Sequence, residues 1–153
     1  MQTLGIEVAH GIADWGDYDG DGDMDILASG NVLDTDGTYK TVLRVYTNTG
    51  GGQYSSQELL PSPDDDWLDI HTATWADYDS DGDMDLLVTG NHVDHTVSQI
   101  VGKSRVFINN ANSFSMLDLL LPAPYDSLGR TGAITWLDID NDGDLDYLVT
   151  GAY

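Results

Sequence analysis

The sequence predicts an all-β fold, and three observations lead to this prediction. One segment occurs three times along the chain, with offsets of 60 and 61 residues. Between the copies, short runs of β-branched, aromatic and other apolar residues are separated by turns rich in Gly, Asn and Asp, which is typical of strands. No apolar stripe with the 3.6-residue period of a helix continues for more than about two turns. We therefore expect strands joined by turns along the whole chain.

The repeat is aligned by its tryptophans, Trp15, Trp75 and Trp136. The aligned segments read ADWGDYDGDGDMDILASG, ATWADYDSDGDMDLLVTG and ITWLDIDNDGDLDYLVTG. A second match supports the alignment, because RVYTN from Arg44 and RVFIN from Arg105 are again 61 residues apart. Repetition at this period indicates one structural unit used several times.

Each period predicts four strands. In the first period they are residues 11–16, 24–29, 41–47 and 54–60, and in the second they lie near residues 72–76, 84–89, 104–109 and 114–120. The fourth strands end at Pro61, Pro63 and Pro122, because proline cannot donate a hydrogen bond to a β-ladder. The third copy reaches Tyr153 after its second strand.

Four antiparallel strands per repeat, arranged radially, make the blade of a β-propeller. We expect a single propeller segment: an N-terminal linker at residues 1–10, blades at 11–63 and 71–122, and the first half of a third blade at 131–153. Propellers usually close with about four to eight blades. The chain is therefore expected to be either a part of a larger propeller or one protomer of a homo-oligomer that completes the ring.

The composition limits the classes of partner. Asp and Glu number 27 against five Lys and Arg, a formal charge of −22, which repels nucleic acid and anionic membranes. Only Glu7 and Glu58 are glutamates, and short Asp side chains suit turns and compact oxygen cages. The chain has no Cys, no membrane-length apolar run and no visible signal peptide. If the protein is secreted, its signal lies outside this chain.

Each copy contains a loop of the form D-x-D-x-D-G-D-x-D. Side chains at positions 1, 3 and 5 turn toward one centre, glycine at position 6 permits the sharp turn, the carbonyl at position 7 faces the centre, and position 9 returns a carboxylate that we expect to be bidentate. Carboxylates this close repel one another by several kcal/mol unless a cation binds. Ca²⁺, which takes six to eight oxygens, fits better than Mg²⁺. We expect three Ca²⁺ per chain.

The predicted metal-binding residues are Asp17, Asp19, Asp21, Asp23, Asp25, Asp77, Asp79, Asp81, Asp83, Asp85, Asp138, Asp140, Asp142, Asp144 and Asp146. At Asp23, Asp83 and Asp144 the backbone carbonyl is the expected ligand. An EF-hand is rejected because its position-12 Glu is replaced by Ala28, Val88 and Val149, and a calcium β-roll because paired glycines are missing. Simple Asp-Gly turns do not account for five matching carboxylates in three copies.

The loop pattern D-x-D-x-D-G-x-x-D, with W-x-D-Y-D before it and D-L-L-V-T-G after it, resembles the FG-GAP/VCBS repeats. Those repeats are the calcium-binding blades of integrin-α-type β-propellers. The resemblance implies that each loop joins the first two strands of a blade and that the ion fixes this hairpin. It also implies ligand roles for Asp17, Asp19, Asp21, Asp25 and their counterparts. The FGGAP signature is not visible, so integrin-like ligand recognition is not implied.

Other repeated residues are interpreted structurally. We expect the three tryptophans to pack between blades rather than to form a carbohydrate platform, and Tyr18, Tyr78 and Ile139 to be packed as well. Arg44 and Arg105 are expected to pair with an acidic neighbour, ahead of a binding role. For His92, Asp94 and His95 a solvated loop is favoured over a transition-metal site, because the first repeat has Val32, Asp34 and Thr35 there.

These observations favour a function without catalysis. No G-x-S-x-G elbow or thiol nucleophile is present, so no catalytic residue is assigned. The first hypothesis is a module with structural calcium that serves adhesion or binds a glycan or protein ligand, in a secreted or surface protein. The second is an architectural fragment that assembles into a full ring. The third, a lyase or hydrolase on a propeller scaffold, lacks a set of candidate residues.

Overall fold

The computed structural model describes residues 6–60, 67–96, 98–119 and 131–151. Its ten strands are β1 (Ala9–Gly16), β2 (Asp25–Leu33), β3 (Tyr39–Asn48), β4 (Tyr54–Glu58), β5 (Trp67–Ala76), β6 (Asp85–Asp94), β7 (Gln99–Asn110), β8 (Ser113–Leu119), β9 (Thr131–Leu137) and β10 (Asp146–Gly151). Within these ranges there is no helix, so none that is long and apolar enough to cross a membrane. The strand ends predicted at Pro61, Pro63 and Pro122 lie outside the described residues.

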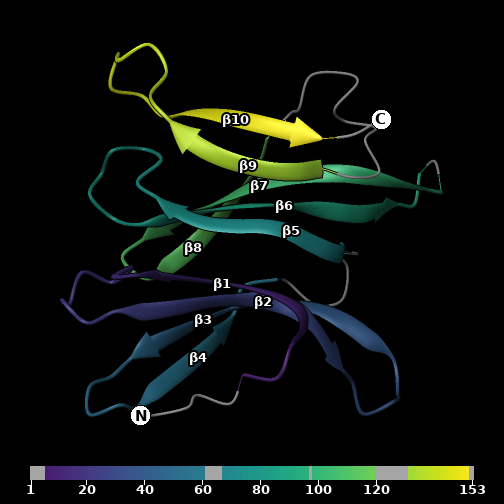
Figure 1. Ribbon diagram of the computed structural model, residues 1–153. Coiled ribbons are helices and arrows are strands. Elements are labelled where there is room, and N and C mark those ends of the chain that lie inside the picture. The colour runs from purple at the N-terminus through teal and green to yellow at the C-terminus, as the bar shows by residue number, and fades with distance from the viewer. Residues whose placement is uncertain (1–5, 61–66, 97, 120–130, 152–153) are drawn as a thin grey trace.

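The strands form three antiparallel sheets, which confirms the prediction of an all-β protein with four-stranded blades. The order is β1-β2-β3-β4 in blade 1, β5-β6-β7-β8 in blade 2, and β9 paired with β10 in a two-stranded sheet called here the half blade. The sheets are stacked one on another, with the loops β1–β2, β5–β6 and β9–β10 at one side (Figure 1). The first strands of the three sheets are neighbours, because β5 contacts both β1 and β9.

Several strands are longer than the apolar pattern predicts. Strand β2 continues to Leu33, which pairs with Tyr39, and β6 continues to Asp94, which pairs with Gln99. In these extensions the backbone ladder continues after the buried stretch has ended. The prediction of a solvated loop around His92 is therefore wrong in part, because His92 is a strand residue that pairs with Val101.

The apolar cores lie between the sheets. The first core joins blades 1 and 2, where Leu27, Leu43 and Val45 are fully buried together with Leu86 and Phe107. The second core lies between blade 2 and the half blade and is centred on Leu87 and Val106. Burial of a large aliphatic or Phe side chain contributes roughly 1.5–3 kcal/mol, so each blade is stabilised mainly through its neighbours.

The two repeated arginines pair as expected. Arg44 contacts Glu58 at 3.0 Å from Nε to Oε2, and Arg105 forms a two-pronged pair with Asp118 on the neighbouring strand. The Arg105 side chain is only 9% exposed, whereas that of Arg44 is 31% exposed. The second pair therefore has the more buried arginine, whereas its carboxylate, Asp118, is more exposed than Glu58, at 52% against 36%.

Interblade packing of the tryptophans is confirmed at two of three positions. Trp75 is buried and Trp136 packs against blade 2, but Trp15 is 55% exposed. Ile139, expected to be packed like Tyr18 and Tyr78, is 68% exposed. The prediction is wrong for these two residues because, in the described part of the chain, no sheet lies beyond blade 1 or beyond the half blade.

Candidate metal centres

The three Asp-rich loops share one backbone turn, which is closed by the residues at positions 1 and 6. The amides of Gly22, Gly82 and Gly143 each donate to Oδ2 of the first Asp of their loop, at 3.1 Å in all three. These glycines have φ between 91° and 97°, where other residues are strained. A Cβ there would meet no atom within 4 Å, so glycine is needed for its backbone conformation and not for space.

The fifth position also serves the turn. The side chains of Asp21, Asp81 and Asp142 each accept a hydrogen bond from the amide two residues later, at 2.8, 2.9 and 3.0 Å. These amides belong to the residues at position 7, whose carbonyls are the predicted ligands. The Asp at position 5 thus orients the backbone of position 7.

In each loop the carboxylates at positions 1, 3 and 9 converge. One oxygen from each of the three side chains lies within 4.8 Å of the other two. The triads are Asp17, Asp19 and Asp25; Asp77, Asp79 and Asp85; and Asp138, Asp140 and Asp146. Of the residues predicted from the sequence, the structure brings these nine together, whereas those at positions 5 and 7 lie outside the triads.

The Asp at loop position 9, called here the ninth Asp, has a role that the sequence interpretation missed. Asp25 accepts hydrogen bonds from the amides of Tyr18 at 3.1 Å and Asn48 at 2.7 Å, one on each carboxylate oxygen. Because Asn48 ends β3, this carboxylate joins the metal loop to the third strand of the blade. A carboxylate has about four lone-pair sites, so both oxygens retain capacity for a cation.

Blade 2 repeats this arrangement. Asp85 accepts from the amides of Tyr78 and Asn109, at 2.7 Å in both cases. Asn109 in turn donates through Nδ2 to the carbonyl of Tyr18 at 2.9 Å, so that the third strand of blade 2 also holds the loop of blade 1. A sequence signal for this role exists, because Asn48 and Asn109 are the last residues of the repeated RVYTN and RVFIN segments.

The half blade has the same loop with less support. Asp146 accepts from the amide of Ile139 at 3.1 Å, as Asp25 and Asp85 do from Tyr18 and Tyr78. In the described part of this sheet there is no third strand to donate a second hydrogen bond. Accordingly Asp146 is exposed, whereas Asp25 and Asp85 are 0% and 1% exposed.

In blades 1 and 2, burial alters the acidity of the ninth Asp. Desolvation raises the pKa of Asp25 and of Asp85, the backbone hydrogen bonds from the two donor amides oppose the rise, and the neighbouring loop carboxylates add to it. Both side chains are therefore held in a setting that disfavours an uncompensated negative charge. A cation at the triad would supply the missing compensation.

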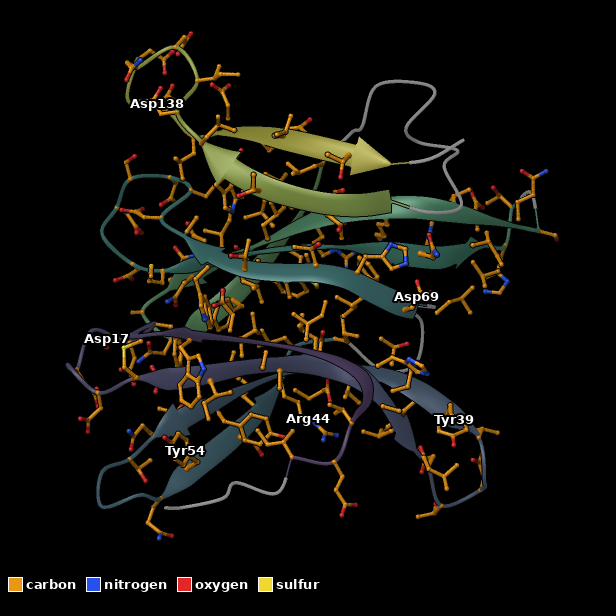
Figure 2. The ribbon with its side chains drawn as sticks, viewed as in Figure 1. Asp17, Tyr39, Arg44, Tyr54, Asp69 and Asp138 are labelled. Carbon is orange, nitrogen blue, oxygen red and sulfur yellow. The ribbon has the colours of Figure 1, made fainter. Side chains whose placement is uncertain are left out.

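The donor set fits a hard divalent cation. All ligand atoms on offer are carboxylate or carbonyl oxygens, which Ca²⁺ prefers. In addition, Oδ1 of Asp17 is buried and has no hydrogen-bond partner, as expected of an oxygen that needs an ion. Asp17 and Asp138 lie at the same side of the molecule, so the candidate centres form a row along the stacked sheets (Figure 2).

Comparison with protein families agrees with this geometry. Residues 17–88 match the family model of the FG-GAP-like repeat. This stretch is similar to an FG-GAP-like repeat. It includes the first two metal loops and all of blade 1 after β1, and it confirms the resemblance to FG-GAP/VCBS repeats. No curated protein and no solved structure matches the chain.

Proposed function

We propose that the chain is a calcium-binding β-propeller module whose ions are structural, one in each Asp-rich loop. The observation behind this proposal is the carboxylate triad, repeated three times, in which the ninth Asp of blades 1 and 2 also holds the third strand. An ion at the triad would fix the first hairpin of a blade and, through the ninth Asp, its third strand. No catalytic role is proposed.

Charge explains why the fold would depend on the metal. Three divalent ions would change the formal charge from −22 to −16 and reduce the repulsion within each loop. A ligand that binds only the folded state stabilises it in proportion to the logarithm of its concentration over its Kd. Calcium affinity is thus part of the folding free energy.

Thermal unfolding with millimolar calcium, with the same concentration of magnesium, and with a chelator tests the proposal. We expect calcium to raise the Tm strongly and magnesium to raise it little, because Mg²⁺ demands a smaller octahedron and retains its waters. A melting curve that does not change on chelation would contradict structural calcium.

The cellular setting proposed for this module is the cell exterior. Sites in extracellular modules bind calcium with a Kd on the order of 10⁻⁴–10⁻³ M, and the triad of the half blade, in which two of the three carboxylates are exposed, fits that weak class. A module of this kind would keep its ions only where calcium is abundant, as it is outside cells. A Kd in the nanomolar range would argue against this setting.

Ligand binding or adhesion is a second candidate function, and one surface favours it. Leu33 and Tyr39 pair across the β2–β3 hairpin and are 63% and 70% exposed. Tyr39 lies at the end of the molecule opposite Asp17 (Figure 2), so it is free of the metal loops. Binding of the wild type and of a Tyr39→Ala variant to a glycan array tests this role. A ligand that binds at this surface should no longer bind once the aromatic side chain is removed. An unchanged binding pattern in the variant would reject this surface.

A further inference from the structure

The residue at position 2 of the first metal loop, Tyr18, is held by side chains of blade 2. Its buried ring stacks on Trp75 of β5 and on Phe114 of β8, with centroids 5.7 and 5.9 Å apart. Its carbonyl accepts a hydrogen bond from Nδ2 of Asn109 in β7 at 2.9 Å, whereas its hydroxyl bonds to Thr47 of its own blade at 2.8 Å. The conformation of the first metal loop therefore depends on the placement of blade 2.

The same asparagine, Asn109, also holds a predicted ligand of the second metal loop. Its backbone amide donates to Oδ1 of Asp85, the ninth Asp of that loop, at 2.7 Å. Its Nδ2 also lies 3.3 Å from the carbonyl of Met84, and its Oδ1 accepts from the amide of Asn112 at 2.8 Å. Because the side chain is fully buried and both of its polar atoms are bonded, it cannot turn without breaking these bonds.

A continuous chain of hydrogen bonds therefore joins the candidate centres of blades 1 and 2, called here site 1 and site 2. Oδ2 of Asp25 at site 1 accepts from the amide of Tyr18, whose carbonyl accepts from the side chain of Asn109. The amide of Asn109 then donates to Asp85 at site 2. Only Tyr18 and Asn109 separate the two carboxylates in this chain. Both carboxylates are buried, so these bonds lie where electrostatic interactions are strong.

The corresponding asparagine of blade 1, Asn48, bonds within its own blade. Its amide donates to Asp25 at 2.7 Å, as the amide of Asn109 does to the ninth Asp of blade 2. Its Nδ2 lies 3.4 Å from the carbonyl of Met24, and its Oδ1 accepts from the amide of Gly50 at 3.0 Å. Asn48 thus supports one site, whereas Asn109 supports two. The pair provides a matched comparison between a local and a connecting asparagine.

We propose that sites 1 and 2 bind calcium with positive cooperativity through this chain of hydrogen bonds, so that an ion at either site raises the affinity of the other. The inference rests on the proposed calcium function. An ion at site 2 would fix Asp85 and, through its hydrogen bond, Asn109. The peptide of Tyr18 and the carboxylate of Asp25 would then already be ordered when site 1 binds its ion, which lowers the entropy lost on binding. Linkage requires the same factor in both directions.

Electrostatic interaction between the loops acts in the opposite direction. Each loop carries five Asp side chains, so an ion in one loop reduces the negative field that attracts an ion to the other. This coupling is negative in sign and is screened by salt, whereas interactions between buried groups are screened much less. Cooperativity that is positive and persists in high salt therefore identifies the hydrogen-bonded chain as its cause.

The first test is a calcium titration of the full chain in high salt, followed by nuclear magnetic resonance. The backbone amides of Gly22 and Gly82 report on sites 1 and 2 separately, because each donates to the first Asp of its own loop. An Asp79→Ala variant removes a ligand from site 2 and leaves Asp85 and Asn109 unchanged. We expect the calcium affinity measured at Gly22 to fall at least about fivefold in this variant.

The sign of this effect separates the hydrogen-bonded chain from charge. The second loop of the wild type, with five Asp and one Ca²⁺, has a formal charge of −3, whereas the Asp79→Ala loop, with four Asp and no ion, has −4. Charge alone would therefore raise the affinity of site 1 in the variant. The reciprocal variant, Asp19→Ala, removes a ligand from site 1 and is expected to lower the affinity measured at Gly82 by the same factor.

The second test removes the connecting side chain. In an Asn109→Ala background, adding Asp79→Ala is expected to change the affinity at Gly22 less than about twofold, because sites that share no partner behave additively. In an Asn48→Ala background the loss of at least about fivefold should remain. Thermal melts in chelator show whether each variant is folded. If Asn109→Ala does not fold, the comparison of the wild type with Asp79→Ala and Asp19→Ala still decides whether the sites are coupled.

Two results would overturn the coupling while leaving the metal function intact. The first is an affinity at Gly22 that is unchanged or higher in Asp79→Ala, and the second is a loss of affinity that persists in full in the Asn109→Ala background. Both are measured on protein that binds calcium. If calcium produces no shift at Gly22 or at Gly82 in the wild type, the proposed metal function fails, and the coupling fails with it.

Discussion

The first two metal loops and the third have nearly the same sequence but different surroundings. In blades 1 and 2 the ninth Asp is buried and accepts a hydrogen bond from an amide near the end of the third strand. In the half blade Asp146 has the loop amide of Ile139 as a partner and is exposed. The comparison teaches that the loop provides the ligands, while the third strand fixes the ligand at position 9.

The largest expected effect comes from removing a supported ninth Asp. An Asp85→Ala variant leaves the buried amide of Asn109 and the part-buried amide of Tyr78 without an acceptor and removes a predicted metal ligand. At about 1–3 kcal/mol for each unpaired group, we expect a loss of about 3 kcal/mol or more in the free energy of unfolding, measured by urea denaturation in chelator. Asp146→Ala should cost less than about 1 kcal/mol. Equal losses in the free energy of unfolding for Asp85→Ala and Asp146→Ala would contradict the proposed difference between the loops with and without a third strand.

The contribution of the third strand can be tested at Asn109. Its side chain is fully buried and donates to the carbonyls of Tyr18 and Met84, at 2.9 and 3.3 Å. Asn109→Ala is expected to destabilise the protein by about 1–3 kcal/mol and to weaken calcium binding at the first two loops. Asn110→Ala, one residue later and exposed, is the control and should leave both quantities unchanged. A loss of stability without a loss of calcium affinity would show that the third strand does not support the metal site.

A smaller effect is expected at the outer edge of blade 2, where Asp118 of β8 meets Arg105 of β7. Burial alone would raise the pKa of Asp118, but the hydrogen bond and charge of Arg105, with Lys103, outweigh it and lower the pKa. A lowered pKa means that this pair stabilises the fold above pH of about 4, the unfolded value, and that the stabilisation is lost as the pH falls through the folded value.

The Asp118→Asn variant should therefore be less stable than the wild type near neutral pH, by up to about 1 kcal/mol because solvent screens a carboxylate that is 52% exposed, with the difference shrinking in acid. Unfolding in urea over a pH series measures it. The pair of blade 1 provides the control, because its Arg44 is more exposed than Arg105, and Glu58→Gln is expected to cost no more than about 0.5 kcal/mol. If the difference in free energy of unfolding between Asp118→Asn and the wild type does not change with pH, the ion pair is not the cause of that difference.

Much of the fold follows from the sequence because its signals are local. The repeat, the loops and the strand that follows each loop are set by residues close together in the chain, and the structure confirms the blades. The extension of β6 through His92 was missed because a backbone ladder continues without an apolar pattern. The exposure of Trp15 and Ile139 was missed because burial of these positions depends on a neighbouring sheet. Copies of the same motif differ in whether such a sheet is present in the described part of the chain.

The candidate site was only partly predictable for the same reason. The sequence identifies the oxygen-rich loop, and it places glycine where φ is positive. It does not reveal that Asp25 bonds to Asn48, a contact between residues 23 positions apart that forms only when β3 pairs with β2. Support of the ninth Asp is a property of the assembled blade, not of the loop.

Calcium titration by isothermal calorimetry, on the full chain in magnesium-containing buffer, tests the central claim most directly. The account predicts three ions per chain, with the sites of blades 1 and 2 binding more tightly than the site of the half blade, and with only the weakest site lost in Asp146→Ala. Absence of calcium binding, or three sites of equal affinity that do not respond to Asp146→Ala, would contradict it.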